Sequence, residues 1–310
     1  MQLAQLRLFK PSQFTSSKHL HTPNYLRPSI RNLCQRRFNS DASSPTRHAY
    51  ALISEFLHPD LGMKDFEVLS RSSLFLVNAS KGQEKRLHLL GPAHVTHPWL
   101  FPHFYPESSH DWLKHVDETY VRLFLGIQDP LTGETKAKFR IDRDITKSDH
   151  LDLVAMTLEE ETDFYWYCNE NQQGPYTVEF SDDPAAGMNV RLEGHNYSKE
   201  EGVDTLRPKT LEGEVSIGLK PRSFVKTEER AVMGMCGGPA IATGTDNSCV
   251  GMVESMVGDL SEDKSQTLTP EHVQQWKSIE GHVVIITSDE LAKFVREREE
   301  KASGADEEDF

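Results

Sequence analysis

The chain of 310 residues lacks the features that most directly identify a class of protein. It has no apolar run of the ~18 residues that a helix needs to cross a bilayer, so we expect no membrane span. It has no G-x-G-x-x-G motif, no P-loop and no paired C-x-x-C, and we expect neither a cofactor nor a metal. It also lacks an excess of positive charge. The formal net charge of −14 argues against nucleic acid as a partner.

Cysteine is scarce as well. The four cysteines are Cys34, Cys168, Cys236 and Cys249, and their spacing follows no disulfide framework. Cys34 lies in an N-terminal segment of unusual composition, which leaves an odd number in the rest of the chain. We therefore expect no disulfide scaffold, and we interpret Cys168 and Cys249 as core or half-buried thiols.

Acidic residues are absent from positions 1–40, which carry seven basic residues and scattered serine and threonine. An N-terminus that is rich in arginine, free of acid and amphipathic is typical of a mitochondrial transit peptide. The sequence Arg36-Arg37-Phe38 resembles a mitochondrial processing site. We therefore expect a mitochondrial protein, located in the matrix, from which residues 1–40 are removed. The alternative is a disordered basic tail.

Short apolar or alternating runs, separated by turn residues, dominate the remaining sequence and indicate β-strands. Helical patterns occur only near the ends, at Thr46–Leu57, at Glu271–Ile279 and from Ser288 to about Glu299. Many short strands with terminal helices predict an all-β sandwich or pair of barrels. An acidic stretch followed by the aromatic run Phe164–Tyr167 marks the expected junction. The predicted divisions are an N-terminal barrel over 46–163, a C-terminal barrel with its helix over 164–299, and an acidic disordered tail over 300–310.

One stretch, Met233–Ile241, packs three glycines and a proline around Cys236. Glycines on both sides permit a tight turn in which backbone N–H groups converge. A nucleophile on such a turn lies beside the donors that would stabilise an oxyanion. The alternative interpretation is a glycine-rich hairpin with a buried cysteine.

Two upstream segments supply the partners that such a nucleophile needs. A strand ends at Gly91-Pro92-Ala93-His94, and Asp152 stands at the start of an apolar strand. A thiol needs a neighbouring base, and the base needs an orienting carboxylate. His97 in place of His94, and Asp149 in place of Asp152, remain open from the sequence.

These segments together resemble the chymotrypsin-type, or trypsin-like, peptidases. The strand ending in His94, the strand opening with Asp152 and the Gly-x-nucleophile-Gly-Gly-Pro turn follow the family's order and rough spacing. The resemblance covers about Phe66 to Arg296 and implies an all-β fold of two packed six-stranded antiparallel β-barrels with the site between them. The family usually has serine as the nucleophile. Cysteine at this position is similar to the picornaviral cysteine proteases, which have the same fold.

The resemblance also implies a role for each residue. His94 would be the general base, Asp152 its orienting carboxylate and Cys236 the nucleophile. The N–H groups of Gly234 and Cys236 would form the oxyanion hole. A cysteine beside a histidine can become a thiolate. The implied activity is hydrolysis of peptide bonds through a thioester, with a polypeptide as the substrate.

Several residues depart from the family pattern. Met235 stands where the family often has an aspartate that pairs with a new N-terminus after zymogen cleavage. Glu254, Ser255 and Met256 stand where the family usually leaves small residues beside the substrate. Arg230 falls at the floor of the family's specificity pocket, where an arginine would favour an acidic side chain unless it is a surface residue.

Two other functions compete with the peptidase. Met235, Met256 and the change from serine to cysteine favour an inactive pseudo-protease that acts as a binding or assembly protein. A dense set of histidines raises the possibility of a metal-binding β protein, although their spacings fit no zinc template. The set comprises His88, His94, His97, His103, His110 and His115.

Overall fold

The structure is a computed structural model that describes residues 47–81, 84–105, 111–171, 173–200, 203–260 and 268–305. The expected transit peptide, residues 1–40, lies outside them. From Pro45 onward the chain forms one compact unit. Within the described part, no helix combines the length and the apolar character that crossing a membrane requires.

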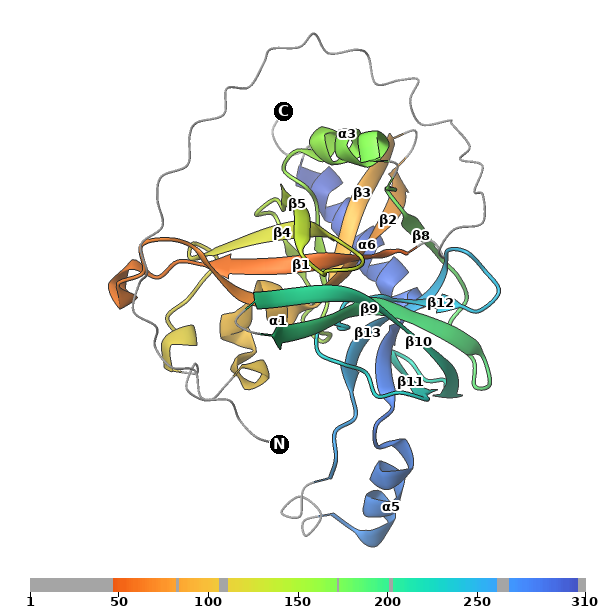
Figure 1. The fold of residues 1–310 in the computed structure, drawn as a ribbon. Coiled ribbons are helices and arrows are strands. Elements are labelled where there is room, and N and C mark those ends of the chain that lie inside the picture. The colour runs from red at the N-terminus through yellow and green to blue at the C-terminus, as the bar shows by residue number, and fades with distance from the viewer. Residues whose placement is uncertain are drawn as a thin grey trace. The chain divides into compact units, whose positions relative to one another are not determined.

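Antiparallel strands make up most of the first half of this unit (Figure 1). They pair in the order β5-β4-β1-β2-β3-β7-β6. Past β5, Ile141 forms an isolated antiparallel bridge with Leu158, which follows β7, so the chain on the two sides of the sheet meets. The strands are β1 (Ala49–Phe56), β2 (Glu67–Lys81), β3 (Glu84–Gly91), β4 (Val121–Gln128), β5 (Thr135–Arg140), β6 (Thr146–Lys147) and β7 (Val154–Met156).

Six strands of the second half close into an antiparallel barrel. Around the barrel the order is β12-β9-β10-β11-β14-β13, and β13 pairs with β12 to complete the circle. This barrel confirms the mostly β class that was predicted. The strands of this half are β8 (Thr177–Phe180), β9 (Asn189–Glu200), β10 (Val203–Ile217), β11 (Arg222–Thr227), β12 (Pro239–Ala242), β13 (Ser248–Met256) and β14 (Val283–Thr287).

Strand β8 and a shared apolar cluster join the two halves. β8 pairs in parallel with β2 on one side and with β13 on the other. The cluster combines Phe75 and Leu90 from the first half with Ile241, Met252 and Ile286 from the second. These residues are buried, so the two halves share one closely packed apolar region.

The helix predicted over Thr46–Leu57 is wrong, because β1 occupies Ala49–Phe56. β1 lies between β2 and β4, and both neighbours pair with it. Five consecutive residues from Tyr50 to Ser54 are buried. A central strand buried on both faces has no strict alternation, and a short apolar run of this kind also fits a helix.

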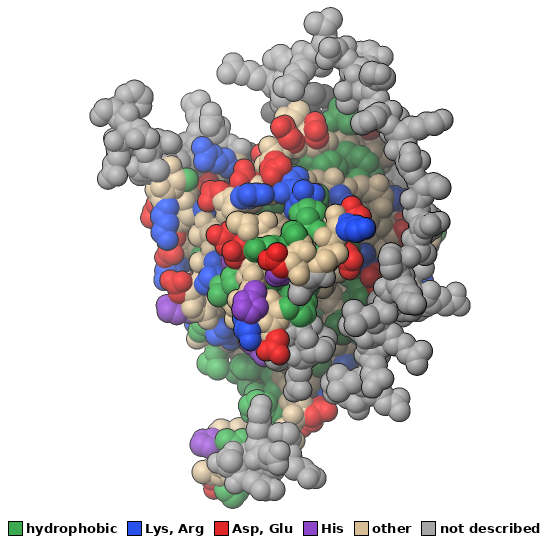
Figure 2. All heavy atoms as spheres, turned by 90° about the vertical axis from the view of Figure 1, so that its left-hand side faces the viewer, with side chains coloured by type: hydrophobic (Ala, Val, Ile, Leu, Met, Phe, Trp, Pro, Cys, Tyr) green, Lys and Arg blue, Asp and Glu red, His purple; other side chains and the backbone are tan. Residues whose placement is uncertain are grey.

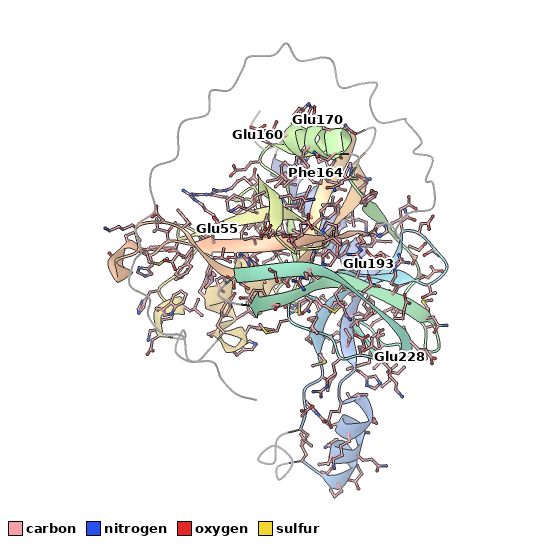
Figure 3. The ribbon with its side chains drawn as sticks, in the orientation of Figure 1. Glu55, Glu160, Phe164, Glu170, Glu193 and Glu228 are labelled. Carbon is pink, nitrogen blue, oxygen red and sulfur yellow. The ribbon has the colours of Figure 1, made fainter. Side chains whose placement is uncertain are left out.

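Helix α3 (Glu161–Asn171) occupies the predicted junction between the halves. Its acidic first turn, with Glu161 and Asp163, complements the positive end of the helix dipole. Phe164 is fully buried and lies on the underside of the helix, toward the strands (Figure 3). The aromatic run that indicated a junction is therefore a helix with one face packed on the first half.

Two further helices are confirmed. α5 (Pro270–Ile279) begins after Thr269, whose side chain accepts the N–H of His272. α6 (Ser288–Ala305) begins as predicted, and Asp183 accepts the N–H of Asp289 at 2.9 Å. α6 continues past Glu299, so residues 300–305 are helical where a disordered tail was predicted. Residues 306–310 lie outside the described part.

Candidate active site

His94 and Asp152 are joined by two hydrogen bonds. His94 lies on α1 (Ala93–Thr96), a four-residue helix that follows β3 and Pro92. Its backbone N–H donates to Asp152 Oδ1 at 2.8 Å, and its Nδ1 lies 2.5 Å from Oδ2. Because a carboxylate only accepts hydrogen bonds, Nδ1 carries the hydrogen of this contact. Nε2 is then the ring nitrogen left to accept a proton. Both side chains are mostly buried, which strengthens the interaction between them.

Two aromatic residues contact the imidazole face and the carbonyl oxygen of His94. The ring of Phe104 stacks on the imidazole with a centroid distance of 4.2 Å and an interplanar angle of 5°. The hydroxyl of Tyr105 donates to the His94 carbonyl oxygen at 2.9 Å. The imidazole is thus held at its Nδ1 edge by Asp152 and on one face by Phe104.

Two positions of the turn around Cys236 have room for glycine alone. Gly237 has φ +84°, and a Cβ there would lie 2.1 Å from the Ser73 carbonyl oxygen. A Cβ on Gly238 would lie 1.8 Å from the carbonyl oxygen of Glu193. The turn therefore packs backbone to backbone against β2 on one side and β9 on the other.

Two serines of β2 anchor this turn. The N–H of Ser73 donates to the Cys236 carbonyl oxygen at 3.0 Å, and the hydroxyl of Ser72 donates to the same oxygen at 2.6 Å. The hydroxyl of Ser73 donates to the Gly234 carbonyl oxygen at 2.7 Å. Both carbonyl groups of the turn are therefore satisfied by β2.

The N–H groups of the turn divide into two sets. Met235 donates to Val232, Gly237 to Val253, and Gly238 to Met235. Within the described residues, the N–H groups of Gly234 and Cys236 donate to no other backbone carbonyl. These two are the predicted oxyanion donors, and donors without backbone acceptors are what such a site requires.

The Cys236 turn lies against the segment that carries His94. A Cβ on Gly237 would lie 2.5 Å from Pro92 Cδ, and Pro92 immediately precedes α1. Burial, reinforced by the negative charge of Asp152, raises the pKa of the Cys236 thiol to about 12. No hydrogen bond joins its Sγ to His94 in the described residues. Burial and the negative charge of Asp152 therefore disfavour the thiolate form of Cys236.

The other two described cysteines differ from Cys236 in access to solvent. Cys168 and Cys249 are fully buried, which confirms their interpretation as core thiols, and burial raises the pKa of each thiol to about 12. Cys236 is partly exposed. Of these three described cysteines, Cys236 is the one that is not fully buried.

His97 and Asp149, the alternatives to His94 and Asp152, do not form a pair. His97 Nδ1 lies 2.7 Å from the hydroxyl of Thr96, and Asp149 is exposed with Lys147 at 3.8 Å. The described histidines do not gather either: no group of three His, Cys, Asp or Glu side chains is placed to hold a metal among the described residues.

Sequence reasoning missed an ion pair beside Asp152. The Asp152 N–H donates to Glu254 Oε1 at 3.3 Å, and Glu254 accepts two hydrogen bonds from Arg222. The available signal was a glutamate within the apolar run of β13, where it is buried. Arg230, by contrast, is an exposed side chain that pairs with Asp259, as a surface arginine would.

No protein-family model matches the chain, and no curated protein matches its sequence.

Proposed function

We propose that this chain is a mitochondrial cysteine peptidase that hydrolyses peptide bonds with Cys236, His94 and Asp152. The observation that carries the proposal is the doubly hydrogen-bonded His94–Asp152 pair next to the Cys236 turn. A base oriented by a carboxylate, beside a nucleophile and two N–H groups that donate to no described backbone carbonyl, is the arrangement that acyl transfer needs.

The proposed reaction begins with a general-base step. His94 Nε2 takes the thiol proton as Cys236 Sγ attacks the peptide carbonyl carbon, and Asp152 stabilises the imidazolium that forms. The N–H groups of Gly234 and Cys236 bind the oxyanion. His94 then donates the proton to the departing amine, which leaves a thioester. Water, deprotonated by His94, hydrolyses the thioester.

The raised pKa of the Cys236 thiol favours this order of events over a preformed ion pair. A thiol with a pKa near 12 is protonated at neutral pH, so the proton must leave during the attack. In this respect the cysteine would act as a serine hydroxyl does, with the base engaged in the transition state.

The proposal includes a trypsin-like arrangement of two barrels. The closed barrel in the second half supports it, and the Ile141–Leu158 bridge supports closure of the first-half sheet. In this arrangement α3 lies at the junction, and the first barrel precedes Phe164. The site residues come from both halves: His94 and Asp152 from the first, Cys236 from the second.

A polypeptide is the proposed substrate, in the mitochondrial matrix. The acidic net charge supports the absence of a nucleic-acid partner. Figure 2 shows one face, on which basic and acidic side chains alternate without a continuous basic surface. Peptides are recognised through backbone hydrogen bonds and side-chain pockets, which do not require such a surface.

The test is acylation by p-nitrophenyl acetate, a simple acyl donor. Attack by Sγ forms a carbon–sulfur bond and releases p-nitrophenolate. Peptide mapping should find the acetyl group on Cys236, with Cys236→Ser acylated slowly and Cys236→Ala not at that site. Acylation of Cys168 or Cys249 at the same rate as Cys236 would overturn the proposal.

A catalytically inactive pseudo-protease is the second candidate, and two observations favour it. Cys236 Sγ has no hydrogen bond to His94 in the described residues, and Phe104 covers one face of the imidazole. In that case Cys236 would not be acylated above the rate of a free thiol of the same pKa, and the chain would act as a binding or assembly protein.

A further inference from the structure

An ion pair of the second half, between the buried carboxylate of Glu254 and the partly exposed guanidinium of Arg222, contacts the backbone on both sides of Leu151. Glu254 of β13 and Arg222 of β11 lie on strands of the closed barrel. Arg222 donates to Glu254 twice, from Nε at 2.5 Å and from Nη2 at 2.7 Å. The same Nη2 donates to the carbonyl oxygen of His150 at 3.4 Å, and Glu254 Oε1 accepts the N–H of Asp152 at 3.3 Å.

The Glu254 carboxylate is costly to bury without a partner. Glu254 is 6% exposed, and the negative charges of Asp152 and Glu254 both raise the pKa of the Cys236 thiol. Two buried negative charges in one region need a cation, because a buried charge left without a partner is strongly destabilising. Arg222 supplies the cation, and the forked guanidinium fixes the direction of the Glu254 carboxylate.

The contacts form one continuous chain that ends at the imidazole. Arg222 orients Glu254, Glu254 holds the Asp152 N–H, and both carboxylate oxygens of Asp152 hold His94. The pair belongs to one half and His94 to the other, so this chain sets the position of the base relative to the barrel that carries Cys236.

We propose that Arg222 and Glu254 are positioning residues: they fix Asp152, and through it His94, against the Cys236 turn. This inference rests on the proposed peptidase function, because it assigns a role within that site. The pair itself does not touch the reacting atoms.

Two variants of Glu254 separate its hydrogen bond from its charge. Glu254→Gln keeps a side-chain oxygen that can accept the Asp152 N–H, whereas Glu254→Ala removes the acceptor. The first readout is the far-downfield proton NMR resonance of the His94 Nδ1–H. The second is the pH profile of Cys236 acylation by p-nitrophenyl acetate.

We expect Glu254→Ala to broaden or shift the Nδ1–H resonance and to lower the acylation rate on the order of tenfold, the cost of one charge-assisted hydrogen bond. Glu254→Gln should keep the resonance and most of the rate. Equal behaviour of the two variants in both readouts would overturn the positioning role.

Variants of Arg222 test the other end of the chain. Arg222→Met leaves Glu254 buried without its cation, and we expect the resonance to be lost. The double variant Arg222→Met with Glu254→Gln removes both charges and keeps the acceptor, so it should fold and recover the resonance. A double variant that folds without the resonance would contradict the proposal.

Asp183→Asn is the matched control. Asp183 pairs with Lys220 at 2.7 Å in the same half but makes no contact with Asp152. Its replacement should lower the thermal midpoint and leave both readouts unchanged; a change in them would contradict a specific role for Glu254. The NMR resonance does not depend on turnover. It therefore tests the positioning role even if Cys236 proves not to be a nucleophile.

Discussion

The hydroxyl of Ser73 donates to the Gly234 carbonyl oxygen at 2.7 Å and lies 2.9 Å from His195 Nδ1. A hydroxyl has one hydrogen, so the second contact must be donated by His195, whose Nδ1 therefore carries a hydrogen. Ser73 belongs to the first half and His195 to the second. This network sets the conformation of the residue that supplies one proposed oxyanion donor.

Ser73→Ala tests how much these hydrogen bonds contribute to the stability of the fold. We expect a loss of about 2 kcal/mol in the free energy of unfolding, because the buried His195 N–H and Gly234 carbonyl lose a shared partner. Urea unfolding measures the change. Ser216→Ala is the control, since the Ser216 hydroxyl donates to the Phe224 carbonyl oxygen at an exposed site, and its effect should be within about 0.5 kcal/mol. Equal losses in the two variants would contradict a special role for Ser73.

The same network predicts a dependence of stability on acid. Burial lowers the pKa of His195 to about 3. A histidine whose folded pKa is below its unfolded value of about 6.5 stabilises the folded state above pH ~6.5, and this stability is lost as the pH falls toward the folded value. Between pH 6 and pH 4 the free energy of unfolding should fall more steeply for the wild type than for His195→Gln. Parallel pH curves would contradict the assignment.

Gly237 and Gly244 provide a matched pair for the nucleophile turn. Both have positive φ, but a Cβ on Gly237 would meet the Ser73 carbonyl oxygen at 2.1 Å, while one on Gly244 would have no atom within 4 Å. Gly244→Ala should therefore cost about 1 kcal/mol of conformational strain. Gly237→Ala should cost more than ~3 kcal/mol and reduce acylation of Cys236. Thermal unfolding of both variants measures the difference, and similar midpoints would contradict the packing described for the turn.

The site could be predicted from the sequence where its determinants are local. The Gly-Met-Cys-Gly-Gly-Pro turn and the strand followed by His94 are contiguous patterns, and the structure places them next to one another. Pairing of His94 with Asp152, left open against His97 and Asp149, required the folded chain. Contacts between residues far apart in sequence, such as Glu254 with Asp152, leave no local signal beyond a charged residue in an apolar strand.

In the fold, too, the features set by local sequence could be predicted, whereas those set by strand pairing could not. The mostly β class and the two C-terminal helices follow from turn spacing and capping residues. β1 was interpreted as a helix because a strand flanked by partners on both sides is buried on both faces, which removes the alternation that identifies a strand. Closure of a barrel depends on which strands pair, and the hydrophobic pattern of each strand does not determine that.

The mitochondrial proposal has its own test. Residues 1–40 carry seven basic residues and no acidic ones, so we expect import followed by cleavage near Arg36-Arg37-Phe38. Sequencing the N-terminus of the protein purified from cells should give a residue close to position 40. Recovery of an intact Met1 would contradict the proposal.

The most direct test of the peptidase is the rate at which p-nitrophenyl acetate acylates Cys236 at neutral pH in the wild type, in His94→Ala and in His97→Ala. His94 is held by Asp152, whereas His97 is a nearby imidazole that contacts Thr96 and Trp99 and has no carboxylate partner among the described residues. General-base catalysis contributes about 10²–10⁴ in rate, so His94→Ala should lower the acylation rate by at least about a hundredfold. His97→Ala should leave it within about twofold, as expected for a group outside the reaction. Equal rates in the wild type and His94→Ala would show that His94 is not the base and would contradict the proposed function.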